Sequence, residues 1–230
     1  MHCDPDSVTI HYQLCFSDGH RVEHTVVLDA APDVQAGESW TRLGFHQCAH
    51  CPLDAAVTPH CPFAIALAKP ARLVGQRASY ETVAALVRWR GREIRQQTTL
   101  QRALGSLLGA ICAASACPHT RPLKAMVRFH LPFSTSDETL YRVLGTYLLG
   151  QYLRSQRSLV ADWNLAELRA TYRNLRDVNA GMAKRLRAAA EEDSSINGLV
   201  LLDLLAADTL DSLDHYEGQL DGYFAEYLED

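Results

Sequence analysis

The sequence predicts an α+β protein, with β-hairpins in the first part of the chain and helices in the second. Two turn signals, Ser17-Asp18-Gly19 and Arg90-Gly91, lie between segments rich in β-branched and aromatic residues. This is the pattern of a β-hairpin. From residue 99 onward, apolar residues recur instead with the helical period. With 230 residues, 47% of them hydrophobic, the chain can bury a substantial core.

The expected strands follow from the two turns. The first hairpin is predicted over 8–14 and 21–28, and the second over 80–89 and 92–98. The segment from Leu100 to Ile111 carries apolar residues on one side, which predicts a core helix.

The starts of two further helices are marked by local signals. Pro62 follows Cys61 directly and precedes an apolar stretch, so it is expected to be the first residue of a helix. Thr135 and Glu138 have the spacing of a capping box, which predicts a helix that continues to about Tyr152.

The end of the chain predicts a long antiparallel helical hairpin. Heptad-like apolar stripes run through 164–190 and 196–228, separated by a polar stretch. We therefore divide the chain into a cysteine-rich α+β metal-binding domain, 1–160, and a helical hairpin, 161–230, packed on that domain or on a second subunit.

Charge is distributed unevenly along the chain. The net charge is −5, yet residues 191–230 hold twelve acidic residues and no lysine or arginine. The acids lie on a helical pattern, which favours an internal contact over a nucleic-acid surface. The predicted hairpin would turn them toward the basic residues of its first helix: Arg169, Arg173, Arg176, Lys184, Arg185 and Arg187.

Four cysteines are the strongest chemical signal. Cys48 and Cys51 form a CxxC pair, and Cys61 and Cys117 add two single thiols. Three of the four are followed by proline. Four converging thiolates can ligate structural zinc or an iron–sulfur cluster. We predict that these four residues are metal ligands.

The order of these thiols bears on the kind of metal. Structural zinc is usually bound by two close pairs, whereas this chain offers one pair and two single cysteines. A Cys-Pro unit is also a feature of iron–sulfur ferredoxins. We therefore expect a [4Fe–4S]-type cluster, with zinc as the alternative. A third interpretation is that these are buried or reactive cysteines without a metal.

Other residues near the thiols are weaker candidates for metal ligands. Cys112 lies in an apolar helical segment and is expected to belong to the core. Four histidines could replace a thiol or donate hydrogen bonds to the sulfurs, although each alone is more typical of a surface histidine: His46, His50, His60 and His119.

The sequence carries no motif of a known catalytic or nucleotide-binding site. An arginine strip with one tryptophan, from Arg88 to Arg102, is a candidate phosphate or base-stacking surface. It is also compatible with a solvated turn. The N-terminus lacks an apolar signal segment, and the longest weakly polar run, 103–116, is shorter than the ~20 residues needed to span a bilayer. We expect a cytoplasmic protein that does not bind a membrane.

Several segments resemble a family of uncharacterised bacterial proteins in which cysteine-proline units precede an RFHLPF stretch. They are FHQCAHCPLD, HCPFAIAL, SACPHT and LKAMVRFHLPFSTSDETLYRVLGTYLLGQY. The resemblance covers roughly residues 8–154. It implies that Cys48, Cys51, Cys61 and Cys117 belong to one set and that Cys112 lies outside it. It implies no activity.

Together these observations predict a metal-binding, iron–sulfur protein that acts as a non-catalytic sensor or protein-interaction protein. One alternative is an electron-transfer component of a redox enzyme. Another is a zinc-stabilised nucleic-acid-binding module that uses the arginine strip. The expected partner is another protein, or a second copy of the chain, bound through the C-terminal helices.

Overall fold

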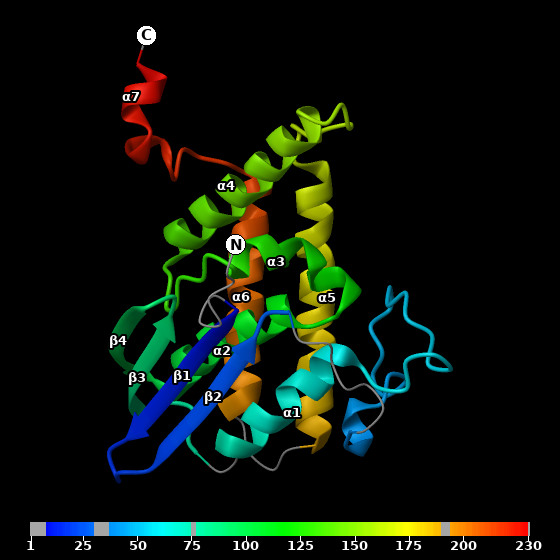
Figure 1. Ribbon diagram of the computed structural model, residues 1–230, viewed down its shortest axis with the longest axis vertical. Coiled ribbons are helices and arrows are strands. Elements are labelled where there is room, and N and C mark those ends of the chain that lie inside the picture. Colours follow the sequence, from blue (N-terminus) through cyan, green and yellow to red (C-terminus); the bar gives the residue numbers. More distant parts are fainter. Residues whose placement is uncertain (1–7, 30–36, 75–76, 190–193, 230) are drawn as a thin grey trace.

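The fold is mixed α+β, with one antiparallel sheet and a set of helices that cover one face of it (Figure 1). The computed structural model describes residues 8–29, 37–74, 77–189 and 194–229. The N-terminal segments form the sheet, and the chain after it is helical, as the sequence predicts.

Both predicted hairpins are present. They consist of β1 (Thr9–Phe16) with β2 (Arg21–Val27) and β3 (Thr82–Trp89) with β4 (Arg92–Thr99). β1 also pairs with β3, which gives a four-stranded sheet of order β2-β1-β3-β4. Gly91 in the second turn has a φ of 68°, a conformation that glycine adopts without a steric penalty.

The inner face of the sheet packs against α2 (Leu100–Ala114) and α1 (Pro62–Val74). Alternate residues of the central strands point into this core, as expected for a sheet that is covered on one side. On β1 they are Ile10, Tyr12, Leu14 and Phe16.

The chain after α2 forms a 3-10 helix (Pro118–Leu123), α3 (Lys124–Val127) and α4 (Ser136–Ser155). The predicted capping box of α4 is confirmed. The Glu138 amide donates to Thr135 Oγ1 at 3.3 Å, and the Thr135 amide donates to Glu138 Oε2 at 2.8 Å. Local sequence therefore fixes where α4 begins.

The last two long helices, α5 (Ala166–Ala189) and α6 (Ser194–Asp214), run antiparallel and pack along each other, and α6 also packs along α2 (Figure 1). Ion pairs join Arg169 to Asp214 at 2.9 Å and Arg176 to Asp203 at 3.5 Å. Basic residues of α5 thus face acids of α6, as the charge pattern predicts.

The prediction that the final helix continues to residue 228 is wrong. α6 ends at Asp214, and a turn at Gly218, whose φ is 84°, separates it from a 3-10 helix (Asp221–Tyr223) and α7 (Ala225–Leu228). The turn is held by the Tyr216 hydroxyl, which donates to Asp221 Oδ1 at 2.7 Å. Glycine adopts this conformation without a steric penalty, which allows the chain to turn after α6.

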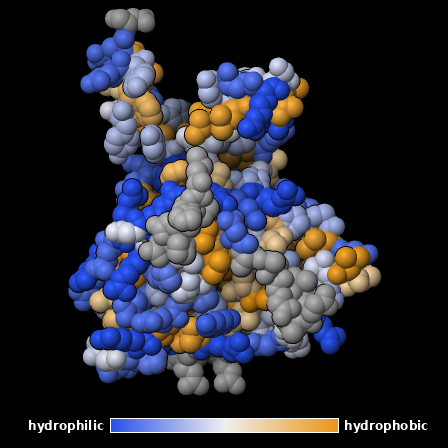
Figure 2. Space-filling view, in the orientation of Figure 1, coloured by the Kyte–Doolittle hydropathy of each residue, from blue (hydrophilic) through white to orange (hydrophobic). Residues whose placement is uncertain are grey.

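The surface includes apolar side chains on the outer helices. Figure 2 shows hydrophobic residues exposed near the C-terminal end of α4, where Leu149 is 58% exposed. Within the described ranges, no single helix is long and apolar enough to cross a bilayer, although α2 and the segment Pro118–Val127, which bend by 106° at their junction, pass that test as a pair.

Candidate metal centre

Three of the predicted thiols lie on the loop that leads into α1. The Cys51 amide donates to the Cys48 carbonyl at 3.0 Å, so the CxxC segment forms a tight turn. The Cys61 amide donates to the Thr41 carbonyl at 2.8 Å, and the Cys61 carbonyl accepts from Ile65 in the first turn of α1. The start of α1 therefore fixes Cys61.

The fourth thiol, Cys117, lies in the short connection after α2. Buried hydroxyls hold this connection: Thr120 Oγ1 donates to the Cys117 carbonyl at 3.0 Å, and Ser115 Oγ donates to the Cys112 carbonyl at 2.8 Å. The amide of His119 donates toward the Cys117 sulfur and lowers its pKa, although burial has the larger, opposite effect. Backbone donors of this kind stabilise a thiolate.

The structure brings the four thiols into one region, because the charges of Cys51 and Cys61 act on Cys48 and those of Cys61 and Cys48 act on Cys117. Burial, with smaller contributions from Cys61 and Cys51, raises the pKa of Cys48 to about 11. Burial raises the pKa of Cys117 to about 12, and Cys61 and Cys48 again contribute. Residues far apart in sequence are thus brought into one region, and without a metal Cys48 and Cys117 are protonated at neutral pH.

This region is not a closed metal site. Among the residues that the structure describes, no group of three or more His, Cys, Asp or Glu side chains is arranged to hold a metal ion. The sulfurs around one zinc ion lie about 3.8 Å apart, because each Zn–S bond is about 2.3 Å long and the geometry is tetrahedral. Binding zinc would require the thiols to move closer. Metal ligation by these cysteines stays a prediction.

α5 forms one wall of the thiol region and supplies a residue that sequence reasoning missed. Arg185 is only 1% exposed. Its guanidinium donates to the carbonyls of Trp40, Arg42 and Leu43 at 2.7–2.9 Å, and its Nε is buried without a partner in the described part of the chain. The sequence predicts that Arg185 faces the acids of α6, and this is wrong.

The environment of Arg185 combines burial with nearby sulfur. Burial lowers the pKa of Arg185, and the charges of Cys61, Cys48 and Cys51 oppose that effect. The charge of the Arg185 guanidinium also acts directly on this set of thiols, because it lowers the pKa of Cys48. In the sequence, Arg185 lies between the apolar residues Met182 and Leu186, which are both buried in the structure. This position is the one sequence signal that the Arg185 side chain starts on the inner face of α5.

Gly181, one turn before Arg185, lets α5 approach the thiols. A Cβ atom at this position would lie 3.1 Å from Cys48 Sγ, closer than ordinary van der Waals contact. Glycine thus makes room for the Cys48 sulfur directly against the helix.

The histidines mainly connect segments around the site. His60 is buried and its Nδ1 lies 2.7 Å from Thr41 Oγ1. His119 Nε2 donates to the His50 carbonyl at 2.9 Å, and the ring of His50 bonds to Asp177 of α5. His46 is exposed and has a φ of 47°.

Cys112 is buried on α2, as predicted for a core residue. Burial raises its pKa well above the ordinary value, and Cys117 and Cys61 raise it further, so it borders the thiol region. Cys15 lies apart, on β1.

The arginine strip is largely engaged within the protein. Arg88 Nε donates to Glu93 at 3.0 Å, and Arg95 bonds to the same carboxylate. The guanidinium of Arg90 lies over the Trp89 ring, 4.9 Å from its centroid. Glu93 thus offsets one of the positive charges that the strip would offer to a nucleic acid.

The fold and the thiol region define a mixed α+β protein of an uncharacterised class. The chain belongs to the family described as a domain of unknown function, DUF6901, whose family model matches residues 10–225. This match agrees with the predicted membership of an uncharacterised family and extends through the helical hairpin. No curated protein and no solved structure matches the chain.

Proposed function

We propose that this protein binds an iron–sulfur cluster through Cys48, Cys51, Cys61 and Cys117 and acts as a non-catalytic sensor or protein-interaction protein. The observation that carries the proposal is Arg185, a buried cation beside these thiols whose Nε has no partner among the described residues. A buried charge is costly unless an opposite charge compensates it.

The raised thiol pKa values explain why a metal would matter to Arg185. In the metal-free protein Cys48 and Cys117 keep their protons at neutral pH, so they provide no negative charge. Metal binding displaces these protons, because thiolates are the ligands. Four thiolates with a [4Fe–4S] core carry a net negative charge, which Arg185 would balance.

The arrangement favours a cluster over a single zinc ion. In a [4Fe–4S] cluster each thiolate binds a different iron, so the ligand sulfurs stand farther apart than on one zinc. A cluster therefore suits thiols that share one region without the close approach that a single zinc ion requires. Loss of the cluster would in turn leave the segment from Trp40 to Cys51 attached to α5 through the Arg185 hydrogen bonds and the His50–Asp177 pair, which gives the site a way to report its occupancy.

Single serine substitutions at Cys48, Cys51, Cys61 and Cys117 are expected to abolish or strongly reduce bound metal, because each removes one ligand. Protein purified without oxygen should be brown and contain about four iron and four sulfide per chain. Cys15→Ser is the matched control and should keep both. Full metal content in Cys117→Ser would contradict the assignment, and stoichiometric zinc without iron would replace the cluster with the alternative.

We also propose that the partner is a protein or a second copy of the chain, bound through the C-terminal helices. The support is the apolar surface of α6 and α7, including Leu204 and Tyr227, which are 59% and 85% exposed. Aspartate at Leu204 and Tyr227 should abolish self-association measured by light scattering, if a second copy is the partner. A monomeric wild-type chain at all concentrations would exclude the second copy.

A further inference from the structure

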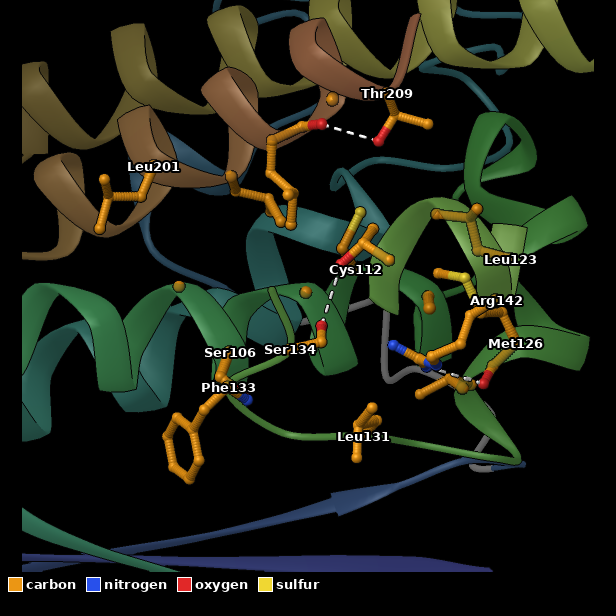
Figure 3. A pocket seen from close by; sticks show the side chains of 18 of the residues that line it. Ser106, Cys112, Leu123, Met126, Leu131, Phe133, Ser134, Arg142, Leu201 and Thr209 are labelled. Atoms are coloured by element: carbon orange, nitrogen blue, oxygen red, sulfur yellow. Dashed lines mark hydrogen bonds between the residues drawn. The ribbon is translucent and has the colours of Figure 1, made fainter. Parts of the chain in front are cut away.

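A second candidate site lies on the other side of α2 from the sheet. A cavity of about 450 Å³ opens between α2, α5, α6 and the segment from Leu123 to Arg142 (Figure 3). Much of its wall is apolar, with Leu123, Met126, Leu202 and Leu205 among the lining residues. Its size is that of pockets that enclose small organic molecules.

Arg142 of α4 extends into this cavity (Figure 3). Its NH2 group donates to the Met126 and Phe129 carbonyls at 3.3 and 3.4 Å, both long for hydrogen bonds. Burial lowers its pKa, so the cation is partly desolvated. In the described part of the chain it forms no ion pair with a carboxylate, and Glu138, one turn earlier, is occupied by the capping box.

Asn179 of α5 is a second polar group that lines the cavity. It is only 3% exposed, and its Oδ1 has no hydrogen-bond partner among the described residues. Other lining polar groups already have partners: Ser134 Oγ lies 3.0 Å from Thr139 Oγ1, and His130 Nε2 lies 2.6 Å from Tyr12 Oη. An unsatisfied polar atom in a buried wall costs free energy, which a ligand can recover.

We propose that this cavity binds a small organic carboxylate with an apolar body. The carboxylate pairs with Arg142, and the apolar body lies against the leucines of α6 and of the segment from Leu123 to Leu131. Asn179 Oδ1 accepts a hydrogen bond where the ligand carries a hydroxyl or N–H group. This inference is independent of the proposed metal function, because none of the four predicted ligands lines the cavity.

The chemistry of the walls distinguishes a carboxylate from a phosphate. A phosphate group is usually held by several cations or by backbone amides at a helix start or glycine-rich loop. Here Arg142 is one partly buried cation, and the other lining arginine, Arg102, is exposed. The start of α4 also lines the cavity, but the Thr135 and Glu138 amides there already donate within the capping box. One guanidinium can bind one carboxylate in a bidentate manner, and the apolar remainder of the cavity suits a hydrocarbon chain or ring.

The test is calorimetric titration of the full chain with 2-naphthoate and with 2-naphthylmethanol, which has a similar shape and no charge. Decanoate and decanol form a second pair with a flexible body. Each acid is expected to bind about tenfold or more tightly than its alcohol. Arg142→Met should remove this preference, whereas Arg157→Met, which removes an exposed arginine outside the cavity, should keep it.

Three results would overturn the proposal: no saturable binding of either acid, equal binding of acid and alcohol, or an acid preference that survives in Arg142→Met. If Arg142→Met does not fold, Arg142→Gln replaces it, because glutamine keeps a donor for the Met126 carbonyl. Metal content is measured in every variant, so a failure of this proposal is distinguishable from a failure of the metal assignment.

Discussion

Replacing Arg185 by methionine is expected to lower the free energy of unfolding by about 3–5 kcal/mol, since the loss of a buried charged donor leaves its partners unsatisfied. The carbonyls of Trp40, Arg42 and Leu43 lose their donor, and methionine cannot replace it. The same variant should also lose metal, because the thiolates lose their nearby cation. Chemical denaturation and iron analysis of one preparation measure both effects.

Arg185→Lys separates the two roles of this residue. Lysine retains the charge but cannot present the planar set of donors that spans three carbonyls. We expect stability to fall in this variant while more metal is retained than in Arg185→Met. Arg187→Met, which removes an exposed arginine of the same helix, is the control. Unchanged stability in Arg185→Met would contradict the anchoring role, and equal metal in all three variants would contradict the electrostatic one.

The stability of the protein is expected to fall by about 3 kcal/mol between about pH 7 and pH 4 through His130 alone. Burial lowers the pKa of His130 to about 3, and the nearby charge of Arg142 adds to this effect. The unfolded histidine takes up a proton near pH 6.5, whereas the folded one stays neutral. The contribution is therefore fully present above pH 6.5 and is lost as the pH falls toward 3.

His130→Gln tests this expectation, because glutamine can still bond to Tyr12 but does not titrate. Its unfolding free energy, measured by denaturation across this pH range, should fall less steeply than that of the wild type. A smaller slope should remain, because burial also lowers the pKa of His24, to about 4. His11→Gln, at an exposed position of β1, is the control and should keep the wild-type slope. Parallel slopes in His130→Gln and the wild type would exclude the effect.

The parts of the fold that sequence predicts are those set by local chemistry. Gly19 and Gly91 mark turns between alternating strands, and Thr135 with Glu138 caps a helix; none of these signals requires a distant residue. The end of the last long helix was predicted wrongly, because the apolar stripe continues past Asp214 while Gly218 and the Tyr216 hydroxyl turn the backbone. The periodicity of apolar residues alone does not show where such a turn ends a helix.

The candidate site, like the fold, could be predicted from the sequence only in part. The grouping of the four cysteines was inferred from their spacing and from a family resemblance, and the structure brings them into one region. Arg185 and Gly181 were not found, because their importance depends on α5 packing against a loop more than a hundred residues away. The cavity around Arg142 was missed for the same reason: its walls come from five separate helices and a loop.

The anchoring of the cysteine loop has a consequence for the order of events during synthesis. The hydrogen bonds from Arg185 to the loop join residues 142 to 145 positions apart in the chain. Cys48 and Cys51 therefore leave the ribosome long before the residue that fixes their loop has been made. Closing so long a segment is among the late steps of folding. A cluster that binds before α5 has been made would do so in a loop that Arg185 does not yet hold.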